Sequence, residues 1–136
     1  MKYIVLILLS SPLYVYAQFK SDIRFDAGLS SEQLDGSLGY QLGLDYMFSN
    51  KSSIGGKVLN AGSFNSFINY KYYFINTSIH FYGMAAYHIR DKDRQGFGIG
   101  TGLLFPISDK FKIGTEAIYE TTFSIYYINL SAVFIL

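Results

Sequence analysis

Residues 37–48 read SLGYQLGLDYMF, and this stretch decides the fold because its side chains alternate in character from one position to the next. Leucine, tyrosine and phenylalanine occupy every even position, whereas glycine and polar residues fill most of the odd ones. A period of two places successive side chains on opposite faces of an extended strand. The stretch therefore predicts a β-strand with one apolar face and one polar face that is rich in small residues.

The same period of two recurs along the rest of the chain, and no segment carries a sustained 3.6-residue stripe. Seven further segments alternate, the last four of them more weakly: 22–29, 111–120, 127–136, 53–60, 64–74, 78–89 and 96–105. Turn-forming residues separate the segments, and a strand of about ten residues crosses a bilayer at a tilt. The sequence predicts an all-β fold, namely an eight-stranded antiparallel up-and-down transmembrane β-barrel.

The first residues have the features of an export signal. Lys2 supplies a positive end, residues 3–9 form an unbroken apolar run, and Val15-Tyr16-Ala17 offers a cleavage site. The run is shorter than the roughly 20 apolar residues that a membrane-spanning helix needs. We therefore expect a signal peptide at residues 1–17 and one barrel domain at residues 18–136.

Charge and cysteine content narrow the classes of function. The chain carries 11 Lys and Arg against 10 Asp and Glu, and Lys2 lies in the expected signal peptide, so the remaining charges balance. Without a basic stripe we expect no nucleic-acid partner. Cysteine is absent, and a small exported domain then needs another source of stability, which a closed hydrogen-bonded barrel in lipid supplies.

The composition of the polar faces indicates which face meets lipid. Their glycines suit the narrow interior of an eight-stranded barrel, whereas glycine on a solvated outer face would only weaken the strands. Their charges have both signs, and a lysine or arginine facing lipid at mid-bilayer costs about 2–4 kcal/mol. Tyrosine and phenylalanine gather towards the strand ends, as in interfacial girdles. The alternative that stays open is a soluble periplasmic barrel of lipocalin type, with the two faces exchanged.

The charged residues on the polar faces form a predicted lumen network. Its members are Arg24, Asp26, Asp45, Lys57, Lys71, Lys112, Glu116 and Glu120. Unpaired charges in a narrow interior would be costly, so we expect these groups to pair. Two interpretations remain open: a salt-bridged plug that fills the lumen, or a narrow gated path for ions or small solutes.

Catalytic and ligand-binding motifs are scarce. His80 and His88, the two histidines, lie eight residues apart on one predicted strand, about 27 Å, so they cannot form a dyad or a shared metal site. A lipid-modifying enzyme that uses His88 with Ser124 and Glu120 is the most distant alternative. Glycines 96, 98, 100 and 102 repeat at a period of two, unlike a dinucleotide fingerprint, and we expect no cofactor.

The last eight residues carry a recognisable pattern. A polar residue is followed two positions later by a small one and then by hydrophobic residues at alternate positions: Asn129, Ser131, Phe134 and Leu136. This resembles the C-terminal assembly signal of outer-membrane proteins, with Leu136 where Phe or Trp is usual and Ser131 where Gly is common. Together with the signal segment and the eight strands, it makes the chain similar to the small outer-membrane barrel family of OmpX and the OmpA transmembrane domain.

The resemblance implies a location and partners. It implies insertion into the bacterial outer membrane by the barrel-assembly machinery and contact with outer-membrane lipid and lipopolysaccharide. Independently, the charged run at residues 90–94 is a candidate for binding a lipopolysaccharide phosphate or a divalent ion, against the alternative of a solvated loop tip. It also implies a first strand that starts on the periplasmic side. We expect a structural or surface-interaction role and no enzymatic activity, and the oligomeric state stays open.

Overall fold

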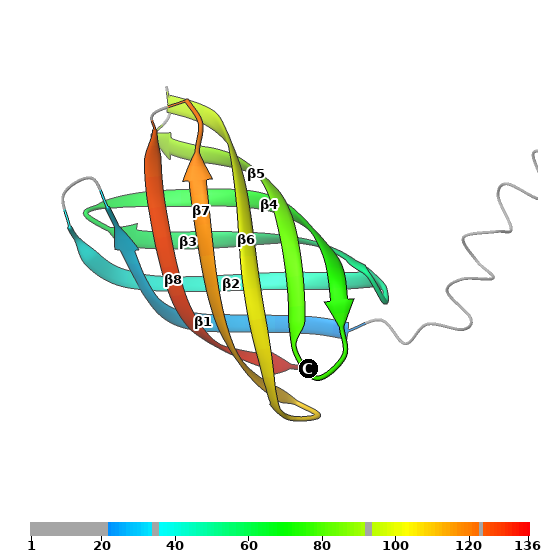
Figure 1. The fold of residues 1–136 in the computed structure, drawn as a ribbon. Helices are drawn as coiled ribbons and strands as arrows, with labels where there is room; N and C mark the ends of the chain where they lie inside the picture. The colour runs from blue at the N-terminus through cyan, green and yellow to red at the C-terminus, as the bar shows by residue number, and fades with distance from the viewer. Residues whose placement is uncertain (1–21, 34–35, 92–93, 123) are drawn as a thin grey trace, which may run out of the picture.

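The computed structural model describes residues 22–33, 36–91, 94–122 and 124–136, so the expected signal peptide lies outside the described part of the chain. Within it, eight antiparallel strands form a closed barrel in which each strand pairs with the next along the chain and the last pairs with the first (Figure 1). The strands are β1 Asp22–Glu32, β2 Leu38–Ser49, β3 Ser52–Ala61, β4 Ser63–Asn76, β5 His80–Asp91, β6 Arg94–Ser108, β7 Phe111–Glu120 and β8 Ile125–Ile135. The predicted fold class is confirmed.

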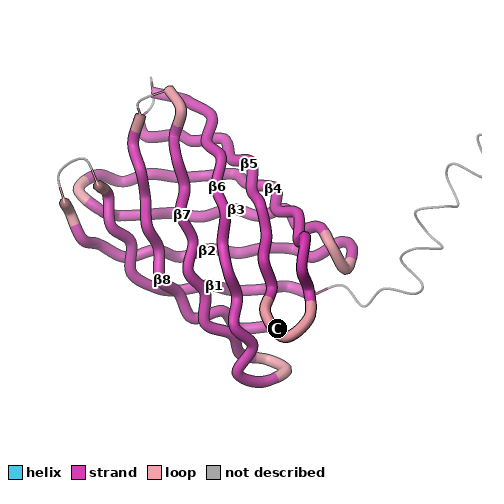
Figure 2. The backbone as a smooth tube through the Cα atoms, viewed as in Figure 1, coloured by secondary structure: helices cyan, strands magenta, loops and turns pink. Residues whose placement is uncertain are grey.

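The strands differ from the predicted ranges by up to three residues: β1 continues to Glu32 instead of residue 29, β5 reaches Asp91 inside the charged run predicted as a turn, and the largest change is in β6, which begins at Arg94. The alternation predicted its end at residue 105 and a turn from Pro106, but β6 continues to Ser108 and Pro106 pairs with Lys112 of β7. The register shifts between Pro106 and Ser108, and a proline, which has no N–H to donate, is tolerated in a strand at such a bulge. Figure 2 shows strands joined by short loops, and no helix in the described part of the chain is long and apolar enough to span a membrane.

The two ends of the barrel differ in what they carry. The start of β1 and the end of β8 lie at one end, together with the turns at 50–51, 77–79 and 109–110 (Figure 1). We call this the terminal end. The strands β1, β3, β5 and β7 finish at the opposite end, since consecutive strands are antiparallel.

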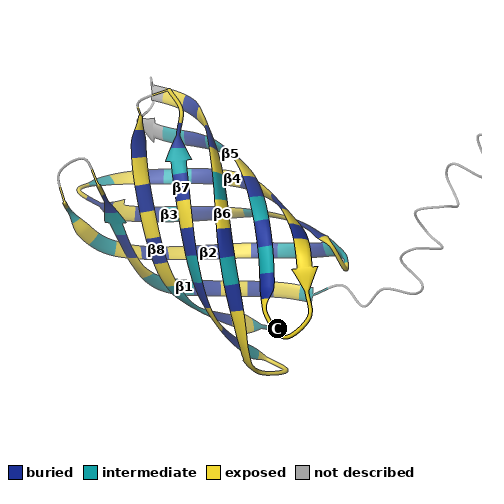
Figure 3. Ribbon diagram, in the orientation of Figure 1, coloured by how far each residue is buried: buried dark blue, intermediate teal, exposed yellow. Residues whose placement is uncertain are grey.

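The strands alternate between buried and exposed residues along their length (Figure 3). Large apolar side chains cover the outer surface all around the barrel, among them Leu29, Leu44, Ile54, Ile68, Phe97, Ile113 and Leu130. Among strand residues whose exposure is described, no Lys, Arg, Asp or Glu sits at an outward position. Most charged strand side chains are instead buried inside, which is the arrangement of a membrane barrel and the reverse of a lipocalin.

Candidate functional site in the barrel interior

Five charged side chains meet near the middle of the lumen. They are Asp26 on β1, Asp45 on β2, Lys57 on β3, Lys71 on β4 and Glu116 on β7, and all five are buried. We call them the central cluster. Each occupies an inward position of its strand, so the period of two in the sequence directs all five towards the barrel axis.

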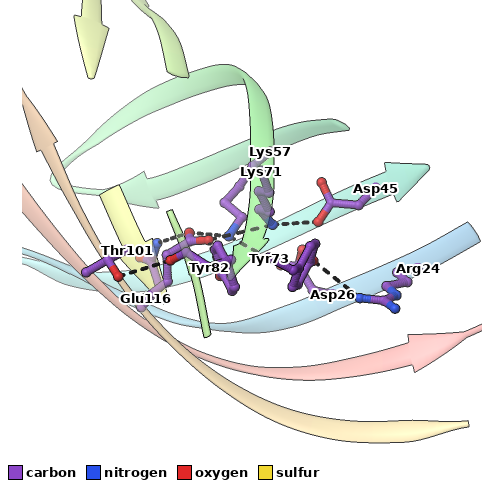
Figure 4. A network of polar contacts seen from close by, with 10 residues as sticks. Arg24, Asp26, Asp45, Lys57, Lys71, Tyr73, Tyr82, Thr101 and Glu116 are labelled. Carbon is purple, nitrogen blue, oxygen red and sulfur yellow. Dashed lines mark hydrogen bonds and ion pairs between the residues drawn. The ribbon is translucent and has the colours of Figure 1, made fainter. Parts of the chain in front are cut away.

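Glu116 is the hub of the central cluster. Lys57 Nζ donates a hydrogen bond of 2.6 Å to Glu116 Oε1, and Lys71 Nζ lies 3.6 Å from Glu116 Oε2. Two neutral donors complete the shell: the Tyr82 hydroxyl at 2.6 Å from Oε2 and the Asn129 amide at 3.2 Å from Oε1. Figure 4 shows both lysines pointing towards this carboxylate. A buried carboxylate with this many donors is fully compensated, which is the condition for a stable buried charge.

The other two carboxylates pair with the same lysines. Lys71 Nζ donates to Asp45 Oδ2 at 2.5 Å, and its ammonium lies 5.2 Å from the centre of the Tyr82 ring. Lys57 Nζ lies 3.8 Å from Asp26 Oδ1. Each ammonium therefore bridges two carboxylates, and the cluster ties β1, β2, β3, β4 and β7 together across the lumen.

Two glycines make room for the carboxylates. A side chain at Gly43 would overlap the Asp26 carboxylate, and one at Gly55 would overlap the Asp45 carboxylate and the Leu44 carbonyl. Glycine at these inward positions is thus required by close approach. This agrees with the expectation that the glycines of the polar faces serve the packing of a narrow interior.

The space left inside is small. A cavity of about 10 Å³ is lined by members of the central cluster together with Arg24, Tyr73, Tyr82, Leu104, Ser131 and Val133. A single water molecule needs about 10–15 Å³ by this measure. At this level the lumen is occupied by side chains and has room for at most about one water molecule.

Three residues of the predicted network lie away from the central cluster. Arg24 and Lys112 lie towards the terminal end, where Arg24 Nη1 donates to the Tyr73 hydroxyl at 3.3 Å and Lys112 Nζ lies 3.2 Å from His80 Nδ1. Glu120 ends β7 at the opposite end, where it accepts a hydrogen bond of 3.0 Å from the Thr122 backbone N–H. The interior therefore contains charged side chains at three levels, and a single network of all eight residues stays a prediction.

Sequence reasoning missed the uncharged members of the interior. Tyr73, Tyr82 and Asn129 all contact network residues, and Ser30 Oγ donates to Asn129 Oδ1 at 2.7 Å. A signal for the tyrosines was present, because Tyr73 shares the inward parity of Lys71 on the same strand. It was obscured by the weak alternation of the 64–74 and 78–89 segments, where aromatic residues occupy both faces.

The opposite end of the lumen is closed by rings. His88 stacks on Phe67 with ring centres 4.4 Å apart and meets the edge of Tyr127 at 5.8 Å. Its Nε2 lies 2.9 Å from Asn65 Oδ1, and the imidazole is fully buried. Ser124, its suggested catalytic partner, is exposed and accepts a hydrogen bond from Tyr119 on the outer face. Among the described residues no group of three or more His, Cys, Asp or Glu is placed to hold a metal ion.

The residues of the predicted assembly signal alternate across β8. Asn129 is buried in the lumen, whereas Phe134 is exposed on the outer face and packs at a tilt against Phe111 with ring centres 5.2 Å apart. Ser131 faces inward between Gly28 and Gly114, and Leu136 is exposed just beyond the strand, with its N–H bonded to the Ile23 carbonyl at 2.8 Å. Asn129 therefore has a structural role in the lumen in addition to any role in assembly.

Comparison with known proteins tests the architecture independently. The sequence matches no protein-family model and no curated protein. Among solved structures, a de novo designed transmembrane β-barrel superposes with a TM-score of 0.69 at 13% identity, covering 85% of this chain and 95% of the design. The N-terminal β-barrel domain of OprF from Pseudomonas aeruginosa gives a TM-score of 0.60 at 15% identity, covering 85% of this chain and 97% of that domain.

The chain has the fold of the small eight-stranded outer-membrane barrels. The Yersinia pestis outer-membrane protein Ail, determined in a phospholipid bilayer nanodisc, shares it with a TM-score of 0.58 at 13% identity, over 86% of this chain and all of Ail. Identities this low show the fold alone. The resemblance to small outer-membrane barrels that the sequence indicated is confirmed at this level.

Proposed function

We propose that this protein is a small integral protein of the bacterial outer membrane, with a structural or surface-interaction role and a filled polar lumen that conducts no solute. The observation that carries the proposal is the central cluster, in which five buried charges pair across the lumen and leave a cavity of about 10 Å³. The apolar outer surface supports the membrane placement. The same surface would contact outer-membrane lipid and lipopolysaccharide.

Single-channel recording in a planar bilayer tests the filled lumen. The wild-type protein is expected to give no conductance steps above the lipid baseline. A variant with Lys57, Lys71 and Glu116 all changed to alanine removes the hub and both bridges, and it serves as the positive control for an emptied lumen. Discrete steps from the wild type, absent when no protein is added, would overturn the proposal in favour of a narrow channel for ions or small solutes.

The placement and the processing are tested together. Membrane fractionation should recover the protein in the outer membrane, and the N-terminus of the mature protein should lie near Gln18 if the signal peptide ends at Ala17. The pattern of Asn129, Ser131, Phe134 and Leu136 supports recognition by the barrel-assembly machinery. A Phe134→Ser variant should accumulate in the periplasm, whereas Phe105→Ser, which changes another outward aromatic residue near the terminal end, should not.

A catalytic role forms no part of the proposal. His88 is enclosed by Phe67, Tyr127 and Asn65, away from the exposed Ser124. Mass spectrometry of lipid A from cells with and without the protein should show the same species. A new lipid species that disappears with His88→Ala but not with Tyr87→Phe would establish an enzymatic activity instead.

A further inference from the structure

Basic side chains gather at the terminal mouth of the lumen, on the side of the central cluster that faces the chain termini. Arg24 on β1, His80 on β5 and Lys112 on β7 are 5%, 8% and 5% exposed. Tyr73 of β4 lies between them, with its hydroxyl at Arg24 and its ring edge towards His80 at a centroid distance of 6.4 Å. Four strands thus contribute to one buried, basic group of residues, which we call the mouth site.

The partner of Lys112 is another base. Its Nζ lies 3.2 Å from His80 Nδ1, an arrangement in which the ammonium donates and the neutral imidazole accepts. Among the described residues no carboxylate oxygen lies within 4.0 Å of Lys112 Nζ. This contrasts with Lys57 and Lys71, each of which contacts two carboxylates. Lys112 is therefore held in position by His80 while its charge stays uncompensated by any close ion pair.

Arg24 also keeps unused donors. One of its terminal nitrogens donates to the Tyr73 hydroxyl at 3.3 Å, and the other lies 3.9 Å from Asp22 Oδ2, whose side chain is 30% exposed. The buried Nε has no hydrogen-bond partner. Figure 4 shows the bond between Arg24 and Tyr73, and Arg24 also lines the small cavity beside Asp26 and Asp45 of the central cluster. A buried guanidinium nitrogen without an acceptor is costly, so a water molecule or a ligand is expected to supply the acceptor that the protein does not.

We propose that the mouth site binds a phosphate-type oxyanion between Arg24 and Lys112. A phosphate oxygen supplies the acceptor that Arg24 Nε lacks and the negative charge that Lys112 lacks. Guanidinium groups match phosphate geometry through paired donors, and an ammonium adds a compact charge. His80 and Tyr73 act as positioning residues. The oxyanion has two sources of the same chemistry, the phosphodiester of a membrane lipid headgroup or free phosphate, and only the lipid source rests on the proposed membrane placement.

Titration in micelles of a maltoside detergent, which contains no phosphate, tests the site directly. The probes are inorganic phosphate and dihexanoyl phosphatidylglycerol, each compared with chloride at equal ionic strength. The readouts are the thermal unfolding midpoint and the NMR signals of the Arg24 Nε–H and the His80 ring. Binding should raise the midpoint with concentration and shift those two signals. Saturation by the lipid alone assigns a headgroup, and saturation by both probes assigns any phosphate.

Two matched double variants test whether the phosphate probes bind at Arg24 and Lys112. Arg24→Gln with Lys112→Gln should weaken binding by about tenfold or more, the loss expected for charge-assisted hydrogen bonds. Lys51→Gln with Lys110→Gln removes the same charge from exposed turns at the same end and should bind like the wild type. If the first pair fails to fold, the wild-type NMR shifts still decide. No saturable shift at Arg24 and His80 with either probe, or an equal loss in the turn variant, would overturn the proposal.

Discussion

Glu116 illustrates how much one side chain can hold together. Its carboxylate receives Lys57, Tyr82 and Asn129 through hydrogen bonds and lies 3.6 Å from Lys71. A buried ion pair is weak evidence for net stability when compared with an apolar replacement, but removing one partner leaves a charge with no compensation. The stability of this interior therefore depends on keeping the set complete.

Glu116→Gln should lower the free energy of unfolding by about 3–5 kcal/mol, since Lys57 and Lys71 then share only Asp26 and Asp45. The measurement is urea unfolding in lipid vesicles followed by circular dichroism, because the chain contains no tryptophan. Lys110→Gln, in an exposed turn, is the control and should change the value by no more than about 0.5 kcal/mol. Equal stability of the two variants would show that Glu116 makes no net contribution to the free energy of unfolding.

Neighbouring glycines on β3 provide a second test at the residue scale. Gly55→Ala should destabilise the barrel by about 1–3 kcal/mol, as an overpacked interior does, because the added carbon overlaps the Asp45 carboxylate and the Leu44 carbonyl. Gly56→Ala faces outward, with its nearest neighbour, the Phe67 carbonyl oxygen, 3.6 Å away. It should be neutral or slightly stabilising, since glycine weakens a strand interior. The same unfolding assay compares them, and a larger loss for Gly56→Ala would contradict the assigned faces.

The sequence of a single strand determines which face each side chain occupies, but not which side chains of other strands lie at the same level of the lumen. Alternation alone placed Lys112, Glu116 and Glu120 on the inner face of β7, and the structure agrees. At about 3.3 Å per residue, four positions span about 13 Å, so the three side chains fall at the terminal end, the middle and the opposite end. Which charges meet depends on the stagger between strands far apart in sequence, such as Lys57 and Glu116. That stagger is a property of barrel closure and not of any one segment.

Two outward positions of β2 test how deep each residue lies in the bilayer. Leu44 lies in the middle of the strand and Leu38 at its end, and both are exposed to the outside. Leu44→Lys should cost about 2–4 kcal/mol in vesicles, whereas Leu38→Lys should cost about 0–1 kcal/mol, because the penalty falls towards the membrane interface. Unfolding from vesicles measures both. Similar costs for the two variants would argue that β2 does not cross the bilayer.

At the scale of the whole molecule, strand number, closure and the inner and outer faces were predictable, since each depends on period and length alone. The packing of rings that closes the opposite end of the lumen was not predictable. Its members, Phe67, His88 and Tyr127, come from three strands, and no local pattern marks them. The turn at Pro106 was misplaced for a related reason. A bulge absorbs the proline, and bulges are set by the pairing partner.

The closed barrel predicts a property of the intact protein. Unheated and boiled samples should migrate differently on a denaturing gel, since the folded barrel stays compact in detergent until heat breaks the closure between β1 and β8. Glu116→Gln should lower the temperature at which the two bands interconvert, and Lys110→Gln should leave it unchanged. A single band at all temperatures would contradict a stable closed barrel.

The partners of the central cluster have a consequence for how the chain enters the bilayer. Lys57 and Lys71 belong to the first half of the chain, and the Glu116 that neutralises them belongs to the second. A partly inserted sheet of β1 to β4 would keep the pairs of Lys57 with Asp26 and of Lys71 with Asp45 but would lack the carboxylate that the two ammoniums share. A lysine that faces lipid at mid-bilayer costs about 2–4 kcal/mol, and this is the upper bound for each of them. We therefore expect β1 to β4 to stay out of the hydrocarbon until β7 can supply Glu116.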